Sequence, residues 1–174
     1  MTSAKPVLGE PAVVPLSDGG MDAFRAIVEQ LPQLLEDLRA APPCGRGTDH
    51  AIPRAPGVYL LSEQGNPIYV GQTRNLRRRH GQHSRASSRH NQATLAFNLA
   101  RKTAASRADI DGRGSRASLA ADPLFDSLFR AARECVAGME FRFVEIREPE
   151  LRTVFEVYAA VAFGTSEHNS FETH

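Results

Sequence analysis

Two short apolar segments, separated by a turn-forming tetrapeptide, constrain the fold of this 174-residue chain more than any other feature. Residues Gly57–Ser62 and Pro67–Gly71 are rich in the branched and aromatic residues that favour β-strands. Between them lies Glu63–Asn66, whose composition is typical of a turn. The pattern predicts a β-hairpin with one tyrosine on each arm, Tyr59 and Tyr69.

The chain before the hairpin predicts one helix between two irregular segments. Residues 1–20 contain three prolines and are expected to form a flexible arm. Over residues 21–40 apolar side chains recur every three or four positions, which predicts an N-terminal helix that Pro32 bends or splits. Residues 41–53 begin with Ala-Pro-Pro and are expected to be a linker. The helix is expected to pack on the sheet or to join a second copy of the chain.

A second helix is expected directly after the hairpin. Thr73 is a capping residue type, so the sequence predicts a helix over Arg74–His83. Positions three, four and seven residues apart share one helical face, which groups Leu76 with Arg79, His80 and His83. Leu76 is expected to anchor this face to the core, so that Arg79 and His83 lie beside the hairpin.

The remaining chain predicts more helices and one further strand. The sequence favours a helix over Ala93–Lys102, a flexible excursion over 106–122, a helix that begins at Asp122-Pro123, a strand over Met139–Ile146 and a final helix over 149–163. The fold class is therefore expected to be α+β, a small three-stranded antiparallel sheet flanked by helices.

Positive charge gathers in the segment that follows the hairpin. From Gln72 to Lys102 there are eight Arg or Lys residues and no Asp or Glu, although the whole chain carries a formal charge of only +1. Such a segment fits contact with a polyanion, and it also fits a solvated helix surface. The candidate nucleic-acid-binding residues are Gln72, Arg74, Arg77, Arg78, Arg85, Arg89, Arg101 and Lys102.

Glu156 is an unusual carboxylate because it lies in an apolar stretch, Val154–Phe163. A buried carboxylate is unfavourable unless it is paired or binds a cation. An ion pair with Arg152, one turn earlier, is one explanation. A Mg²⁺ ion held by one carboxylate and several waters is the other.

The other polar candidates are not diagnostic when taken singly. Tyrosines on a hairpin are usually packing residues, and an Arg–His pair on a helix is usually solvated. His80, His83 and His90 lie close in sequence and could form a zinc site, but they lack a cysteine partner or an HExxH frame.

Cysteine usage and hydropathy favour a cytoplasmic protein. Cys44 and Cys135 are far apart and show no metal-binding spacing, so a reducing compartment is the simpler expectation. No apolar run approaches the roughly 20 residues that a membrane-spanning helix needs. The first residues lack an apolar signal core, so no secretory signal and no membrane association are expected.

In combination, these residues resemble the GIY-YIG nuclease family. Gly57-Val58-Tyr59 is similar to the first signature element of that family, and Tyr69-Val70-Gly71 to the second. The resemblance covers roughly residues 54–170. It identifies six candidate catalytic residues, namely Tyr59, Tyr69, Arg79, His83, Glu156 and Asn169.

The resemblance implies a domain layout and a mechanism. Residues 54–174 would form the nuclease-like domain, with an enlarged helical insertion over 84–138. Tyr59 would activate a water molecule, with Arg79 lowering its pKa and clamping the phosphate, and Glu156 would hold Mg²⁺ or Mn²⁺ at the leaving oxygen. Tyr69 would bind phosphate, relay a proton or shape the site. Some family members carry a lysine where this chain has Gln72.

The implied function is a metal-dependent DNA endonuclease or nickase. The alternative is a non-catalytic nucleic-acid-binding module that retains the fold, and the presence of Tyr59, Arg79 and Glu156 together favours the enzyme. A third alternative is an assembly protein whose basic segment binds an acidic partner. No separate DNA-reading module is visible, so specificity is expected from the basic segment or from a protein partner. Double-strand cleavage by one active site would require a homodimer or sequential nicking.

Overall fold

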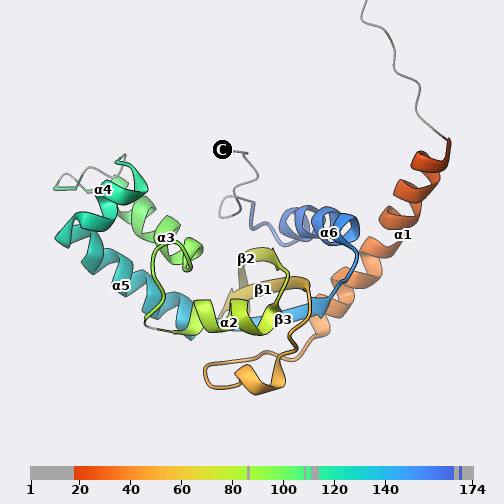
Figure 1. Cartoon of the computed structure of the whole chain (residues 1–174), viewed down its shortest axis with the longest axis horizontal. Helices are drawn as coiled ribbons and strands as arrows, with labels where there is room; N and C mark the ends of the chain where they lie inside the picture. Colours follow the sequence, from red (N-terminus) through yellow and green to blue (C-terminus); the bar gives the residue numbers. More distant parts are fainter. Residues whose placement is uncertain (1–17, 86, 108, 111–113, 167–168, 170–174) are drawn as a thin grey trace, which may run out of the picture.

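A computed structural model describes residues 18–85, 87–107, 109–110, 114–166 and 169 of the chain (Figure 1). Its centre is a three-stranded sheet of order β2-β1-β3. The central strand β1 (Gly57–Glu63) pairs antiparallel with β2 (Asn66–Thr73) on one side and with β3 (Glu140–Glu145) on the other. The predicted fold class, a three-stranded antiparallel sheet flanked by helices, is confirmed.

The hairpin closes through a two-residue loop. Glu63 pairs with Asn66, and the two residues between them, Gln64 and Gly65, have φ values of 51° and 81°. Positive φ at both central positions is the geometry of a type I′ turn, which matches the twist of the flanking strands. β2 is an edge strand, and this position tolerates Pro67 because one side of the strand forms no ladder.

The sheet separates two cores, because successive side chains of β1 point to opposite faces. Val58 and Leu60 pack with Val70 beneath α1 (Asp18–Ala40) and α6 (Pro149–Ala162). Tyr59 and Leu61 face the other core. Figure 1 shows α1 and α6 together on one side of the sheet, away from α2.

The N-terminal helix differs from the prediction in two respects. It begins at Asp18 rather than at Met21, and Pro32 lies inside one continuous helix instead of splitting it. Leu31 and Leu38 are both buried in the core shared with α6. We attribute the continuity of the helix to this packing, which compensates for the hydrogen bond that proline cannot donate. Residues 1–17 of the predicted arm lie outside the described residues, and residues 18–20 are helical rather than part of an arm.

The segment predicted as a linker packs against the sheet. Cys44 exchanges backbone hydrogen bonds with Phe141 at 2.8 and 3.0 Å, which forms an isolated antiparallel bridge. A 3₁₀ turn follows at Asp49–Ala51, and Ile52 is completely buried. Residues 44–52 therefore form part of the core that contains Tyr59.

Helix α2 (Leu76–Ser84) starts later than predicted, because Thr73 is not its capping residue. The side chain of Asn75 accepts a hydrogen bond from the backbone N–H of Arg78 at 2.9 Å, whereas the Thr73 hydroxyl accepts from the backbone N–H of Asn75 at 3.1 Å. Thr73 thus shapes the turn before the helix. The predicted face is confirmed, since Leu76, His80 and His83 are all buried.

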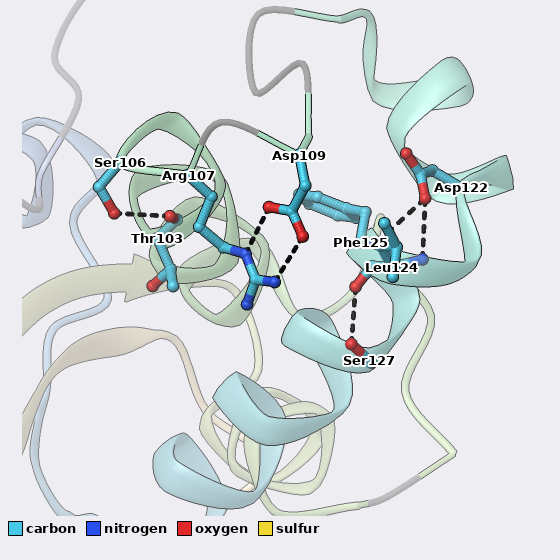
Figure 2. Close-up of polar contacts among 8 residues, drawn as sticks. All are labelled: Thr103, Ser106, Arg107, Asp109, Asp122, Leu124, Phe125 and Ser127. Carbon is cyan, nitrogen blue, oxygen red and sulfur yellow. Dashed lines mark hydrogen bonds and ion pairs between the residues drawn. The ribbon is translucent and has the colours of Figure 1, made fainter.

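Three helices lie between α2 and β3 in the described chain, namely α3 (Thr94–Ala105), α4 (Arg116–Ala121) and α5 (Pro123–Gly138). The Asp122 carboxylate accepts hydrogen bonds from the N–H groups of Leu124 and Phe125, as Figure 2 shows, which confirms the predicted start of α5. The prediction of a flexible excursion over 106–122 is wrong in part. Residues 116–121 are helical, and Leu119 is buried in the core that contains Tyr59.

None of the helices in the described part of the chain is both long and apolar enough to cross a membrane.

Candidate active site

The candidate site is centred on the hydroxyl group of Tyr59, which is completely buried. Arg79 Nε donates a hydrogen bond to this oxygen at 2.9 Å, and His83 Nε2 lies 3.2 Å from it. The ring of Tyr59 stacks on Phe141, with centroids 5.0 Å apart and an interplanar angle of 14°. The predicted convergence of Arg79 and His83 on the hairpin is therefore what the structure shows.

The glycines of the two tripeptides have packing roles. A Cβ atom at Gly71 would lie under 3.0 Å from the ring and hydroxyl of Tyr59 and from the ring of Tyr69. A Cβ atom at Gly57 would collide with the backbone oxygen of Val144 and with Leu76. Gly71 thus leaves the space that the Tyr59 hydroxyl occupies, and Gly57 lets β1 approach β3 and α2 closely.

Arg79 is held in a defined orientation by several acceptors. Besides the Nε bond to Tyr59, its Nη1 donates to Gln82 Oε1 at 3.3 Å and to the backbone oxygen of Gln92 at 3.2 Å. Gln82 lies three residues further along the same helix, a neighbour that helical spacing would have suggested. The contact with Gln92 arises from a long-range turn, and no feature of the sequence signals it.

Tyr69 forms the outer part of the tyrosine pair. Its ring centroid lies 6.1 Å from that of Tyr59, and the two side chains are hydrogen-bonded. Tyr59 is fully buried, whereas Tyr69 keeps part of its surface exposed. Tyr69 is therefore the more exposed residue of the pair.

Burial has the largest effect on the pKa values of Tyr59 and Tyr69, and it sets the direction of both shifts. It raises the pKa of Tyr59 above its usual 10, and the charge and hydrogen bond of Arg79 only partly offset that effect. Burial also raises the pKa of Tyr69, and the neighbouring Tyr59 adds to the increase. Arg79 lowers the pKa of Tyr59, as expected from the sequence, but this effect is smaller than the increase caused by burial.

Glu156 and Asn169 bind the outer edge of β2. Glu156 Oε1 accepts from the backbone N–H of Gln72 at 3.0 Å, and the Asn169 side chain pairs with both the N–H and the C=O of Val70. Val70 and Gln72 are two residues apart, so their backbone groups point to the same side of the strand. These two side chains satisfy backbone groups that an edge strand leaves unpaired.

Gln72 links Glu156 to Arg152. Its side-chain nitrogen donates to Glu156 Oε2 at 2.8 Å, and its side-chain oxygen accepts from Arg152 Nε at 3.2 Å. The direct ion pair between Arg152 and Glu156, one of the two sequence-based explanations, is replaced by this bridge. Burial raises the pKa of the Glu156 carboxyl group, and the two hydrogen bonds from Gln72 counteract part of that increase.

Side chains from both sides of the sheet come together at the edge of β2. Tyr59 and Tyr69 belong to one face, while Glu156 comes from α6 on the other. The Glu156 charge nevertheless acts on the pKa of both tyrosines, raising it in each case. The two tyrosines, Arg79 and Glu156 therefore form one electrostatically coupled cluster.

The donor set suits a hard divalent cation better than zinc. Within the described ranges, no three His, Cys, Asp or Glu side chains are grouped so that they could hold a metal ion. His80 packs edge-on against Phe141 and His90 against Phe129, so the histidines serve separate aromatic contacts. A single carboxylate that is oriented by hydrogen bonds from Gln72 fits an ion such as Mg²⁺, which retains most of its waters.

The basic residues predicted to bind nucleic acid have different environments. Arg77 donates to the backbone oxygens of Ile52 and His50, at 2.6 and 3.1 Å, and so ties the preceding segment to α2. Gln72 belongs to the Glu156 network rather than to an open surface. The side chains that remain exposed are Arg74, Arg78, Arg85, Arg89, Arg101 and Lys102.

His83 should make the protein sensitive to acid. Burial lowers its pKa from 6.5 to about 3, and the charge of Arg79 adds to this effect. Above pH 6.5 the histidine is neutral in both the folded and the unfolded chain. Below it the unfolded chain takes up a proton that the folded chain excludes, so stability falls by about 1.4 kcal/mol per pH unit until about pH 3.

A His83→Gln variant should lose this contribution. Urea unfolding of both proteins at pH 7, 6, 5 and 4 is expected to show wild type losing stability relative to the variant as the pH falls. A free-energy difference that stays constant over this range would show that His83 titrates equally in the folded and unfolded states.

A protein-family model matches the segment of the chain that contains most of the candidate site. Residues 55–106 match the family model described as the GIY-YIG catalytic domain. The match contains both tyrosines, Gln72, Arg79 and His83, and it ends before Glu156 and Asn169. No curated protein matches the chain.

Two solved structures align loosely with the chain. Both are of the GIY-YIG N-terminal endonuclease domain of UvrC from Thermotoga maritima, in different tyrosine-to-phenylalanine mutants bound to a catalytic divalent cation. The first shows 14% identity and a TM-score of 0.36, covering 72% of this chain and 93% of that one. The second shows 12% identity and a TM-score of 0.34, covering 72% and 99%. These likenesses are too weak to transfer the role of any residue. The match over residues 55–106 confirms the resemblance to the GIY-YIG nuclease family that the sequence predicted.

Proposed function

We propose that this protein is a metal-dependent endonuclease or nickase that hydrolyses phosphodiester bonds in DNA. The observation that supports this most strongly is the convergence of Arg79 and His83 on one buried tyrosine oxygen, at 2.9 and 3.2 Å, beside a carboxylate on the sheet edge. A packing role alone would not require a guanidinium group, an imidazole and a second tyrosine around that hydroxyl.

In this proposal the tyrosine pair receives the proton of the attacking water. Tyr69, the partly exposed member, contacts the water and passes a proton through its hydrogen bond to Tyr59. Tyr59 passes its own proton to His83 Nε2, whose neutral ring has a lone pair to accept it. Because the pKa of His83 lies near 3, the histidine is a weak base and holds this proton only while negative charge builds up on the attacked phosphate. Arg79 stabilises the negative charge that develops on Tyr59 and on the phosphate. This order gives Tyr69 the contact with water that the sequence alone assigned to Tyr59.

The role of Glu156 is to hold a divalent cation. Its two oxygens each accept one hydrogen bond from Gln72, which leaves lone pairs for a metal and fixes the carboxylate plane. When bound, Mg²⁺ or Mn²⁺ supplies Lewis-acid stabilisation of the departing oxygen. Asn169 maintains the strand edge between Tyr69 and Gly71, and we assign it a positioning role.

The test is metal-dependent nicking of DNA. Wild-type protein is incubated with supercoiled plasmid, branched DNA and single strands in Mg²⁺, in Mn²⁺ or in EDTA. We expect nicked product with at least one of the metals, none in EDTA, and recovery when excess metal is restored.

The same experiment separates the rival functions. A non-catalytic binding module would retain salt-dependent affinity for DNA and produce no nicks with any substrate or metal. A protein whose basic segment binds an acidic protein partner would show neither nicking nor salt-dependent DNA affinity. Either result would overturn the proposed function.

A further inference from the structure

A basic pocket lies beside α2. Its volume is 640 Å³, and four arginines line it: Arg54, Arg77, Arg78 and Arg85. Among the described lining residues every ionisable side chain is an arginine, and the others are neutral. This concentration of one charge in a concave site favours an anionic ligand.

The pocket's attraction for an anion comes from side chains rather than from the start of the helix. The backbone N–H groups of Leu76 and Arg77 donate to Ala55 and Pro53, and that of Arg78 donates to the Asn75 side chain. The first turn of α2 therefore has no N–H group left for a ligand among these three. Arg77 donates to the backbone of Ile52 and His50 and is partly buried. Arg54, Arg78 and Arg85 are exposed to solvent.

The pocket shares a wall with the candidate active site. Gln82 and Gln92 line the pocket, and the same two residues accept the hydrogen bonds of Arg79 Nη1, at 3.3 and 3.2 Å. An anion in the pocket would thus lie one layer of side chains away from Arg79. DNA presents phosphates at a regular spacing along each strand, so a strand held at Arg79 brings a neighbouring phosphate to this region.

We propose that the pocket binds a backbone phosphate of the DNA strand, adjacent to the phosphate that Arg79 contacts. Guanidinium groups recognise phosphate oxygens with paired, planar hydrogen bonds, and three exposed arginines around one pocket suit this geometry. Arg54 is part of the pocket although it precedes the hairpin, because residues 53–55 are hydrogen-bonded to the start of α2. The inference rests on the proposed function for the identity of the strand but is tested by binding alone.

The experiment measures DNA affinity against salt concentration in EDTA, where no cleavage is expected. Fluorescence anisotropy of labelled DNA is recorded for wild type, Arg54→Gln, Arg78→Gln and Arg85→Gln between about 50 and 200 mM NaCl. The control is Arg130→Gln, an exposed arginine on α5 that pairs with Asp126 at 3.1 Å. Loss of one phosphate contact should reduce the slope of log K against log salt by roughly 1 and weaken binding. The control should retain the wild-type slope.

A neutral methylphosphonate, placed next to the cleavage position mapped with wild type, identifies the ligand as a phosphate. It should weaken binding by wild type and have little further effect on Arg78→Gln, because both changes remove the same contact. Pocket variants with the wild-type slope, or a methylphosphonate effect that is fully additive with Arg78→Gln, would overturn the pocket proposal. Such results leave metal-dependent nicking by wild type intact, so the two proposals fail separately.

Discussion

Replacing Arg79 with alanine is expected to reduce the nicking rate by at least about 10³-fold while the fold is retained. Arg79 is the cation hydrogen-bonded to Tyr59, at 2.9 Å, and it is oriented by Gln82 and Gln92. Removal of a single preorganised donor commonly lowers turnover by about 10²–10³-fold, and arginines that stabilise phosphoryl transfer contribute about 10³–10⁵-fold. The rate is measured from the conversion of supercoiled to nicked plasmid at saturating metal.

An Arg79→Lys variant separates charge from geometry. Lysine keeps the positive charge but cannot reach Tyr59, Gln82 and the Gln92 backbone at once with a planar fork, so a loss of about 10²-fold or more is still expected. Circular dichroism and thermal unfolding check the fold, which the stacking of Tyr59 on Phe141 should preserve. Arg130→Ala, an exposed arginine on α5, is the matched control. Cleavage by Arg79→Ala within a few-fold of wild type would remove Arg79 from the site.

The parts of the site that the sequence predicted are those set by local rules. A turn-forming tetrapeptide between two β-favouring segments predicted the hairpin, and helical spacing placed Arg79 and His83 on the face anchored by Leu76. The observed bonds of Arg79 and His83 to Tyr59 follow from those two local features. The first residue of α2 was harder to predict, because both Thr73 and Asn75 are capping residue types. Only the geometry of the folded chain selects Asn75.

The long-range contacts could not be predicted in the same way. The sequence marked Glu156 as an isolated carboxylate, but the identity of its partner depended on how α6 crosses the edge of β2. Nothing in the sequence indicated that the side chain of Gln72 bridges Glu156 and Arg152. The complete burial of Tyr59 was also hidden from the sequence, since it depends on Phe141 from a distant strand.

The Gln72 bridge gives Glu156 a position that is independent of bound metal. Two hydrogen bonds at 3.0 and 2.8 Å hold its carboxylate, and Arg152 fixes the amide of Gln72 from the other side. Arg152 is itself buried and donates to the backbone oxygen of Ile146 at 3.2 Å. Such supporting contacts orient a metal ligand before the ion arrives, which favours a site built on only one carboxylate.

Replacing Glu156 with alanine is therefore expected to abolish metal-dependent nicking, with a loss of at least about 10³-fold. The variant removes the one carboxylate that the cluster offers to a cation, and it leaves two hydrogen-bond donors of Gln72 without their acceptor. Metal binding is followed by isothermal titration with Mn²⁺, and cleavage by plasmid nicking over a range of Mg²⁺ and Mn²⁺ concentrations. DNA affinity in EDTA should change little, because the phosphate contacts proposed here belong to arginines.

Two further variants distinguish loss of a metal ligand from loss of structure. Glu150→Ala removes an exposed carboxylate from the first turn of the same helix and should cleave like wild type. Glu156→Gln preserves the size of the side chain but not its charge, so it should fold normally and remain inactive. If EDTA blocks cleavage while Glu156→Ala and Glu156→Gln still cleave, the cation is held by other groups. In that case Glu156 serves only to satisfy the backbone of β2, because its bonds to Gln72 would then be its whole contribution.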